Sequence, residues 1–389
     1  MTTASPPDLL AETFAGKTVW LSGHTGFKGS WLAQWLLDLG ASVHGFALEP
    51  HTSPALFSQL DLEHRLAHRI GDLRDAAAVN DSIQQAQPDF VFHLGAQAIV
   101  RTSFAEPVAT YATNVMGSIH VLEALRRLDK PCAAVLVTTD KCYENQEWVH
   151  GYREDDKLGG YDPYSSSKAA MEIAIGSWRQ SFFANHSVRV ASGRAGNVIG
   201  GGDWATDRIV PDSIRALQAG SAVPVRNKIA RRPWQHVLDP LACYLWLAAV
   251  LSRPSLRPYD AGLFASGFNF GPELNSNRTV AELVTEVLRH WPGTWEDRSD
   301  PNAVHEATLL NLATDKAFHL LGCRPVWGFD RAIEATVAWY RVALDLTQDA
   351  SATPALIALT SRQIAEYRRD AQAVNAPWQV ASPPPVSEA

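Results

Sequence analysis

The sequence TVWLSGHTGFKG, residues 18–29, places a short apolar run directly before three glycines at three-residue spacing. The run from Thr18 to Ser22 has the length and β-branched content of a buried strand, and a helix is expected from Gly29 to Leu39. Between them the glycines let the backbone approach a phosphate closely, and the helix N-terminus supplies N–H donors and a positive dipole end. A strand, a glycine loop and a helix in this order predict a dinucleotide-binding unit.

The GxxGxxG spacing is one residue wider at its start than the commonest dinucleotide fingerprint, so the prediction depends on its position between strand and helix. A P-loop is excluded, because Lys28 precedes Gly29 and Ser30 instead of standing between a glycine and a hydroxyl residue. The loop residues expected to contact the dinucleotide are Gly23, Thr25, Gly26, Phe27 and Lys28.

Two further strand ends are expected beside the same cofactor. Asp72, at the end of a third strand and followed by Leu73, can accept a hydrogen bond from the adenine amine. Glu49 is a second candidate, for a ribose hydroxyl, and with Lys28 close by the charges leave both NAD and NADP open. Small residues after His93 permit close approach to the nicotinamide ribose. The contacts expected there are Leu94, Gly95, Ala96 and Gln97.

Short β-branched runs alternate with longer helical patterns through the first half of the chain, which is typical of a doubly wound parallel sheet of the Rossmann type. The expected strands are Thr18–Ser22, Ala41–Ala47, Phe90–Leu94, Ala133–Thr138 and Val188–Arg194. After Asn197, glycine-rich loops and proline-broken helices predict a smaller substrate-binding lobe.

These patterns predict an α/β chain with four parts. Residues 15–198 form the dinucleotide-binding domain, with return segments near 234–270 where Phe268–Gly271 rejoins the sheet. Residues 199–233 and 271–345 form the substrate-binding lobe, and residues 346–380 a C-terminal helical extension. Residues 381–389 contain three consecutive prolines and are expected to be a disordered tail.

The composition is that of an ordinary globular protein and excludes several functional classes. The 389 residues are 46% hydrophobic and 19% charged, and the net charge of -7 provides no attraction to nucleic acid. The four cysteines show neither paired short spacing nor the density of a disulfide scaffold. No signal peptide, membrane span or membrane partner is expected, so we predict a cytoplasmic protein. His64 and His68 lack a third ligand, and we expect no metal site.

A second informative segment is VLVTTDKCY, residues 135–143, followed by YSSSK, residues 164–168. Tyr164 and Lys168 stand four residues apart on one helix face, where the ammonium can stabilise a phenolate and let the tyrosine act as a base. That pair suffices to oxidise an alcohol. The additional acid and amine of Asp140 and Lys141, at the end of a neighbouring strand, predict a reaction that also moves protons on adjacent carbons.

Five segments together resemble the extended short-chain dehydrogenase/reductase superfamily and, within it, the nucleotide-sugar 4,6-dehydratases. They are GHTGFKGSWL at 23–32, YATNVMG at 111–117, TDKCY at 139–143, GGYDPY at 159–164 and RPWQHV at 232–237. The resemblance runs from about residue 15 to residue 345. Most members of this family are known for an Asp-Glu pair where this chain has Asp140 and Lys141, and the lysine form resembles the branch that acts on CDP-glucose.

The resemblance implies an NAD-dependent reaction in several steps. Tyr164, assisted by Lys168 and Thr139, would take the C4 hydroxyl proton while hydride leaves C4. The ketone acidifies the C5 hydrogen, so Lys141 would remove that proton while Asp140 protonates the departing C6 hydroxyl, and hydride then returns to C6. Asp140 must therefore be protonated and Lys141 neutral, which a close ion pair opposes. An alternative is that Lys141 stabilises the enolate while another group or water takes the proton.

The resemblance also implies contacts outside the catalytic turn. Further cofactor contacts are expected from Asn114, Thr138, Tyr164 and Lys168. Guanidinium groups suit diphosphate oxygens, and the nucleotide sugar is expected to contact Asn197, Arg208, Arg232, Arg278 and His305. The expected assembly is a homodimer or homotetramer, with an interface involving residues 111–125 and 164–178.

Two alternative functions stay open at this point. One is a 4,6-dehydratase or 4-epimerase for a GDP-, dTDP- or UDP-linked sugar in place of CDP-glucose. A 4-epimerase would keep Tyr164 and Lys168 but has no need of Asp140 and Lys141. The other is an inactive cofactor-binding scaffold, against which the intact tyrosine and lysine count.

Overall fold

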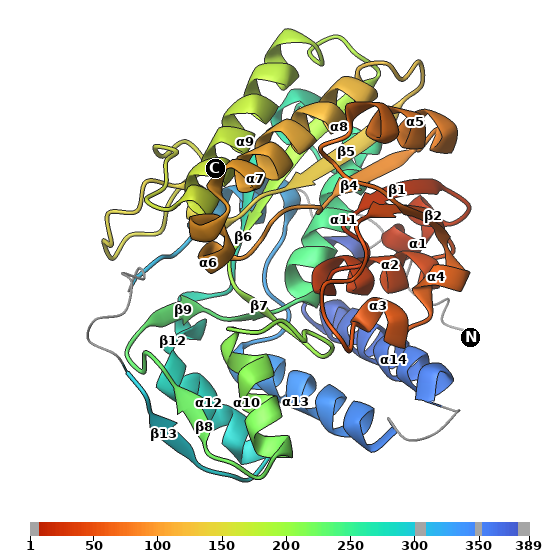
Figure 1. Ribbon diagram of the computed structural model, residues 1–389. Helices are drawn as coiled ribbons and strands as arrows, with labels where there is room; N and C mark the ends of the chain where they lie inside the picture. Colours follow the sequence, from red (N-terminus) through yellow and green to blue (C-terminus); the bar gives the residue numbers. More distant parts are fainter. Residues whose placement is uncertain (1–7, 300–308, 347–351, 380–389) are drawn as a thin grey trace.

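A parallel sheet forms the centre of the computed structural model, which describes residues 8–299, 309–346 and 352–379 (Figure 1). Its seven strands lie in the order β3-β2-β1-β4-β5-β6-β11, and every neighbouring pair is parallel. The strands are β1 Thr18–Ser22, β2 Ser42–Ala47, β3 Ala67–Ile70, β4 Phe90–His93, β5 Cys132–Val137, β6 Val188–Ala195 and β11 Gly267–Phe270.

The strand order reverses beside β1. From β1 the chain moves outward through β2 and β3, then returns to place β4 on the other side of β1 and continues in that direction. In open α/β sheets, ligands bind outside the carboxyl ends of the strands at such a reversal. The crevice beyond Ser22 and His93 is therefore the expected cofactor site.

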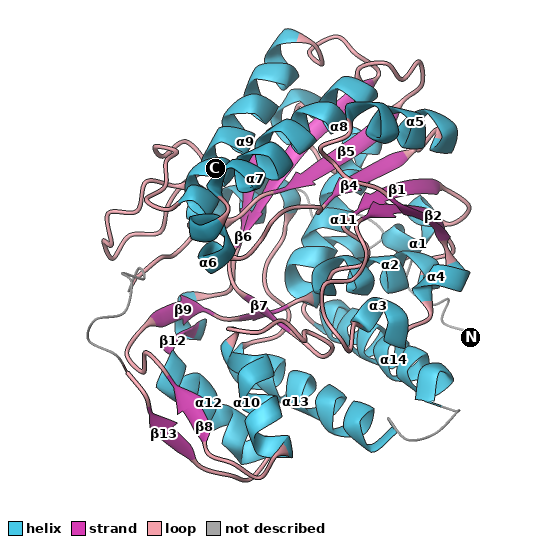
Figure 2. Cartoon of the chain, in the orientation of Figure 1, coloured by secondary structure: helices cyan, strands magenta, loops and turns pink. Residues whose placement is uncertain are grey.

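Helices cover both faces of the sheet, as Figure 2 shows. Val19 and Leu21 of β1 contribute to one apolar core, and Trp20 points to the opposite one, because successive strand residues face opposite sides. The first core is covered by α2 Phe27–Asp38 and α11 Leu238–Ser252, and the second by α5 Ala76–Ala86, α8 Gly117–Leu125 and α9 Pro163–Ser181. Burial on both faces explains the nearly continuous apolar strands.

Shorter and outer helices complete this part of the molecule. They are α1 Leu9–Phe14, α3 Leu56–Gln59, α4 Leu62–Arg65, α6 Val100–Ala105, α7 Pro107–Tyr111 and α14 Ala352–Ala373. α14 lies within the segment expected as a helical extension and packs against α2. Across the part of the chain that is described, no helix is both long and apolar enough to cross a bilayer.

A lobe of small strand pairs lies beyond the carboxyl ends of β5 and β6 (Figure 1). Its pairs are β7 Val198–Ile199 with β10 Gln235–His236, β8 Val223–Val225 with β13 Trp295–Asp297, and β9 Arg231–Pro233 with β12 Asn277–Thr279. Its helices are α10 Ile209–Gln218, α12 Val280–His290 and α13 Phe329–Leu346.

The sequence-based fold class, a Rossmann-type doubly wound sheet, is confirmed. Each of the five expected strands and the returning strand β11 is present, with bounds that differ from the expected ones by at most one residue. Residues 381–389, expected as a tail, lie outside the described residues.

Candidate active site

The catalytic segment begins where β5 ends. Val137 is the last strand residue, and Asp140–Cys142 form a turn of 3-10 helix, η2. The backbone N–H of Lys141 donates to the hydroxyl of Thr139 at 3.3 Å, which stabilises this turn. Asp140 and Lys141 are therefore not alternating strand residues, as the sequence required if both were to reach one substrate.

Asp140 is a buried carboxyl group, with 2% of its surface exposed. Its Oδ1 accepts from the Thr139 hydroxyl at 3.0 Å, and its Oδ2 has no hydrogen-bond partner among the residues described. Burial raises the pKa of Asp140, against the opposing charges of Lys141 and Arg232. A proton donor requires a pKa that is raised in this way. A Cβ at Gly196 would lie 2.6 Å from Oδ2, so a side chain there would press on this carboxyl.

Tyr164 and Lys168 lie in α9 and are both buried. Asp162, two residues before Tyr164, caps the helix by accepting from the backbone N–H of Ser165 at 2.9 Å. Burial raises the pKa of Tyr164 to about 12, and a hydrogen bond with the Thr139 hydroxyl opposes that rise. Burial also lowers the pKa of Lys168 to about 8. The Lys168 ammonium donates to the Val137 carbonyl at 3.4 Å, at the end of β5.

The glycine loop is packed so closely against neighbouring backbone that a side chain would not fit at Gly23 or Gly29. Gly23 has φ +75°, and a Cβ on it would lie 2.8 Å from the Gly95 nitrogen. A Cβ on Gly29 would lie 2.1 Å from the Gly23 carbonyl oxygen. α2 begins after Gly26, which has no side chain to cover the first N–H groups of the helix. The open helix N-terminus and the bare backbone fit a dinucleotide diphosphate.

The segment after β4 is held by paired amides. The Asn114 side chain accepts from the Gln97 N–H at 2.8 Å and donates to the Gln97 carbonyl at 3.0 Å. The Gly95 N–H donates to the Ser22 hydroxyl at 3.0 Å, which holds Leu94, Gly95 and Ala96 at the end of β1. Leu73 packs against Gly95: a Cβ placed on Gly95 would lie 2.7 Å from the Cδ1 atom of Leu73.

Three other expected cofactor contacts have protein partners of their own. Asp72 is held by the Arg74 guanidinium, with contacts of 2.5 to 3.0 Å that lower the pKa of its carboxyl. The Thr25 hydroxyl donates to the Leu48 carbonyl at 2.9 Å. The Thr138 hydroxyl donates to Glu172 at 2.5 Å.

Lys28 lies among the catalytic groups. Burial lowers the pKa of Lys28 to about 8, the charges of Arg208 and Lys168 add to that shift, and Asp140 opposes it. Its ammonium is 5.6 Å from the centre of the Tyr244 ring. The side chain therefore extends toward the reaction centre, although its residue belongs to the glycine loop. Phe27, its neighbour, packs toward Gly200 at the entrance of the lobe.

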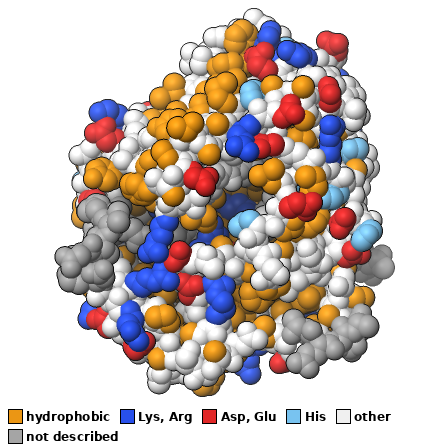
Figure 3. Space-filling view, in the orientation of Figure 1, with side chains coloured by type: hydrophobic (Ala, Val, Ile, Leu, Met, Phe, Trp, Pro, Cys, Tyr) orange, Lys and Arg blue, Asp and Glu red, His pale blue; other side chains and the backbone are white. Residues whose placement is uncertain are grey.

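Figure 3 shows Lys and Arg side chains gathered around a hollow. Four of the five expected substrate residues lie in the described part of the chain. Arg232 of β9 and Arg278 of β12 are direct partners in the antiparallel pair. Arg208 begins α10 and forms an ion pair with Asp203 at 2.8 Å. Asn197 follows Gly196, the glycine that lies against the Asp140 carboxyl. His305 lies outside the described residues.

Sequence reasoning missed three buried groups beneath the catalytic turn: Tyr143, Glu172 and Arg194. The Glu172 carboxylate accepts from Arg194 at 2.7 Å, and Arg194 donates to the Tyr143 hydroxyl at 2.7 Å. The sequence offered a signal for Glu172 only. Tyr164, Lys168 and Glu172 recur every four residues and therefore share one face of a helix.

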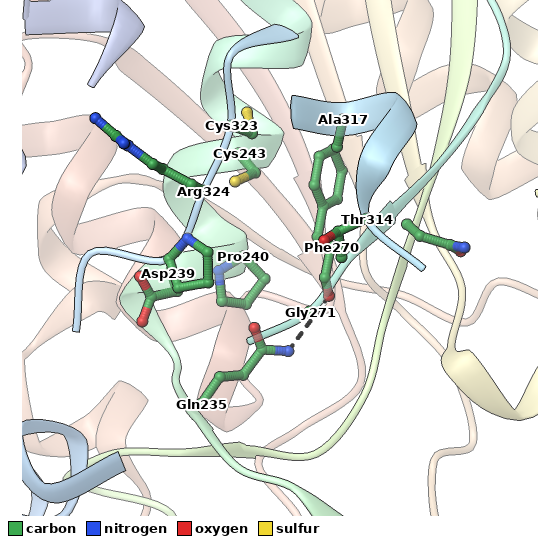
Figure 4. Close-up of a pocket in the computed structure, with 12 residues that line it drawn as sticks. Gln235, Asp239, Pro240, Cys243, Phe270, Gly271, Thr314, Ala317, Cys323 and Arg324 are labelled. Carbon is green, nitrogen blue, oxygen red and sulfur yellow. Dashed lines mark hydrogen bonds between the residues drawn. The ribbon is translucent and has the colours of Figure 1, made fainter. Parts of the chain in front are cut away.

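A separate small cavity lies between α11, β11 and the segment 314–325 (Figure 4). It measures about 20 Å³, which is room for about one water molecule. Asp239, Cys243 and Cys323 line it, and none of the expected catalytic groups does. No group of three or more metal-ligating side chains occurs within the described ranges, where His64 bonds to Asp61 and His68 to His24.

The chain is similar to known nucleotide-sugar 4,6-dehydratases. The family model for GDP-mannose 4,6-dehydratase matches residues 21–255. CDP-glucose 4,6-dehydratase of Salmonella typhimurium is 44% identical over 84% of this chain and 91% of its own length. dTDP-glucose 4,6-dehydratase of Streptomyces antibioticus is 31% identical over 70% of this chain and 75% of its own.

Solved structures share the fold at lower identity. The dTDP-glucose 4,6-dehydratase of Bacillus anthracis in complex with NAD has a TM-score of 0.67 and 18% identity, covering 83% of this chain and 96% of its own. The UDP-glucose 4-epimerase of Thermotoga maritima has a TM-score of 0.70 and 21% identity, covering 84% of this chain and 99% of its own. Both enzymes use the same sheet and lobe, so the fold alone does not separate dehydratase from epimerase.

Proposed function

Because the chain belongs to the nucleotide-sugar 4,6-dehydratases, which are hydro-lyases, we propose that it converts CDP-D-glucose to CDP-4-dehydro-6-deoxy-D-glucose with NAD as its cofactor. The observation that carries this proposal is the buried Asp140 in a turn with Lys141, beside the Tyr164 and Lys168 pair of α9. A 4-epimerase needs only the second pair. The relative that shares 44% identity is named for CDP-glucose, which favours that nucleotide.

The glycine loop and the uncapped start of α2 would hold the NAD diphosphate, with Gly95 and Asn114 bounding the nicotinamide side. When bound, NAD accepts hydride from C4 of the sugar and later returns it to C6, so the cofactor leaves the cycle unchanged. The protein supplies binding, orientation and proton transfer.

Tyr164 accepts the C4 hydroxyl proton. Its phenol is buried and has a raised pKa, so it needs nearby positive charge and hydrogen bonds to act as a base. The Thr139 hydrogen bond and the Arg208 charge both lower the Tyr164 pKa against the effect of burial. We assign Lys168, one helical turn further along α9, as a second charge that stabilises the phenolate. Oxidation at C4 leaves a ketone that acidifies the hydrogen on C5.

Asp140 and Lys141 then remove water across C5 and C6. Lys141 takes the proton from C5, and Asp140 gives its proton to the C6 oxygen, which leaves as water. Lys141 returns the proton to C5 as hydride adds at C6, and the C4 hydroxyl proton held by Tyr164 replaces the one that Asp140 gave up. Burial raises the Asp140 pKa, which favours the protonated carboxyl, and Oδ2 has no hydrogen-bond partner among the described residues. The turn η2 lets both side chains face adjacent carbons of one sugar.

The nucleotide end would be held by arginines. Arg232 and Arg278 lie opposite each other on β9 and β12, and Arg278 also forms an ion pair with Glu282 at 3.2 Å. Guanidinium groups suit the diphosphate, and Arg208 lies near Tyr164 and Lys28. Asn197 would contact the sugar or its phosphates beside Asp140.

The test is product formation from a panel of nucleotide sugars. Purified protein with NAD is incubated with CDP-, dTDP-, UDP- and GDP-linked glucose, and 4-keto-6-deoxy product is expected from CDP-glucose. Tyr164→Phe should bind NAD as the parent does and lose turnover. Absence of product from CDP-glucose, or full turnover by Tyr164→Phe, would contradict the proposal.

We further propose a homodimer in the cytoplasm. The helices α7 and α9 pack together and expose apolar side chains, including Val108, Tyr111 and Ile173, where Figure 3 shows a hydrophobic face. Such contiguous apolar surface is typical of a subunit interface. The four cysteines are free thiols, which suits a reducing compartment.

A further inference from the structure

A buried ion pair joins two elements beneath the proposed reaction centre. Glu172 of α9 and Arg194 of β6 are 4% and 6% exposed, and the guanidinium donates to the Glu172 carboxylate at 2.7 Å. Glu172 stands one helical turn after Lys168 and two turns after Tyr164. The ion pair therefore belongs to the same helix face as the oxidising pair.

The ion pair also holds both ends of the catalytic turn. Thr138, which precedes the turn, donates its hydroxyl to Glu172 Oε1 at 2.5 Å. Tyr143, which follows the turn, accepts from Arg194 at 2.7 Å and donates to the Asn269 amide oxygen at 2.7 Å. One acid and one base thus anchor the residues on either side of Thr139–Cys142.

Stability alone gives little reason for this arrangement, because replacing a buried ion pair by apolar residues of similar volume is often neutral or stabilising. Catalysis gives a reason. Tyr164 must reach C4 while Asp140 and Lys141 reach C5 and C6 of the same sugar, and productive geometry tolerates displacements of only about 0.5 Å.

We infer that Glu172 and Arg194 are positioning residues, which hold the turn carrying Asp140 and Lys141 in register with Tyr164 and Lys168. The inference rests on the proposed dehydration. Neither residue touches the reacting atoms. Their hydrogen bonds to Thr138 and Tyr143 set the distance between the oxidising pair and the eliminating pair.

Tyr143→Phe tests this inference with a minimal change, since it removes one hydroxyl and leaves the ion pair and the ring in place. A loosened turn should slow water elimination while C4 oxidation continues. In a rapid-mixing experiment with CDP-glucose, reduced nicotinamide should form at close to the parent rate. Its decay should slow by about 10- to 100-fold, the size of effect that small misplacements produce.

Ser192→Ala is the matched control. The Ser192 hydroxyl donates to the same Glu172 carboxylate at 2.9 Å but lies in β6, away from the turn. In this variant, reduced nicotinamide should decay at the parent rate. Glu172→Gln keeps the side-chain shape and removes the charge, and its decay should slow as in Tyr143→Phe. Thermal unfolding of each variant establishes that it is folded.

The outcomes separate this inference from the proposed function. The positioning role is supported if reduced nicotinamide forms rapidly and decays slowly in both Tyr143→Phe and Glu172→Gln. Equal loss of both phases, or unchanged decay in Tyr143→Phe, would overturn it while the parent enzyme still turns over CDP-glucose. A parent enzyme without turnover on any nucleotide sugar would overturn the proposed function and this inference together.

Discussion

At the residue scale, the proposed water elimination depends on Asp140. Its carboxyl has 2% of its surface exposed, and burial raises its pKa despite the nearby Lys141 and Arg232 charges. A raised pKa keeps the acid form present at higher pH than an exposed aspartate would allow. Asp140 can therefore donate a proton, which the C6 oxygen needs in order to leave as water.

We predict that Asp140→Asn separates oxidation from elimination. Loss of a positioned general acid slows proton transfer by about 10²- to 10⁴-fold, so dehydration should fall by that amount while C4 oxidation persists. In the parent enzyme the elimination rate should decrease as pH rises through the raised Asp140 pKa, because only the protonated carboxyl acts. Rapid mixing over a pH series measures both phases. Parent-like decay in Asp140→Asn would contradict the assignment.

At the element scale, the start of α9 positions Tyr164, the proposed base. Pro163 occupies the first turn, and Asp162 accepts from the Ser165 backbone N–H and hydroxyl at 2.9 and 2.6 Å. The Tyr164 N–H donates to the Ser103 hydroxyl at 3.1 Å, which ties this turn to α6. The position of Tyr164 therefore depends on a helix cap as well as on packing.

We predict that Asp162→Ala lowers turnover through this cap. Loss of an N-cap side chain reduces the free energy of unfolding by about 1 kcal/mol and loosens the first turn. Asp75→Ala is the matched control, because Asp75 caps α5 in the same way, through the N–H groups of Ala77 and Ala78 at 3.0 Å. Both variants should lose similar stability in urea unfolding, and only Asp162→Ala should lower kcat. Equal kcat values would contradict the prediction.

At the scale of the whole molecule, the sheet and the lobe contribute different parts of the candidate site. The carboxyl ends of β1, β4 and β5 hold the glycine loop, the amide-bound segment and the catalytic turn. The lobe adds Arg232 and Arg278, which lie opposite each other on β9 and β12. Helices α7 and α9 expose the apolar side chains of the proposed subunit interface.

We predict that Ile173→Glu converts a dimer to a monomer. Ile173 lies on α9 with 61% of its surface exposed, and a charge placed in a subunit interface is costly to bury. Ile229→Glu is the control, because Ile229 is 68% exposed and belongs to the lobe. Sedimentation velocity should show a monomer for Ile173→Glu and the parent species for Ile229→Glu. A dimeric Ile173→Glu would contradict this interface.

Much of the fold and part of the site were predictable because their signals are local. The strand from Thr18 to Ser22, the three glycines and the four-residue spacing of Tyr164 and Lys168 each follow from neighbouring residues in the chain. The end of β5 before Asp140 was predictable for the same reason. The roles of the individual site residues stay proposals until the variants are measured.

The sequence by itself determined the parallel sheet, the glycine loop and the presence of an oxidising pair beside an acid and an amine, since each depends on local periodicity and spacing. Only the tertiary structure decided which side chains contact one another. It directs Lys28 toward the reaction centre, closes Arg74 on Asp72, and joins Glu172 to Arg194 and through it to Tyr143. Such contacts depend on distances between segments far apart in the chain, and burial then sets the proton affinity of Asp140.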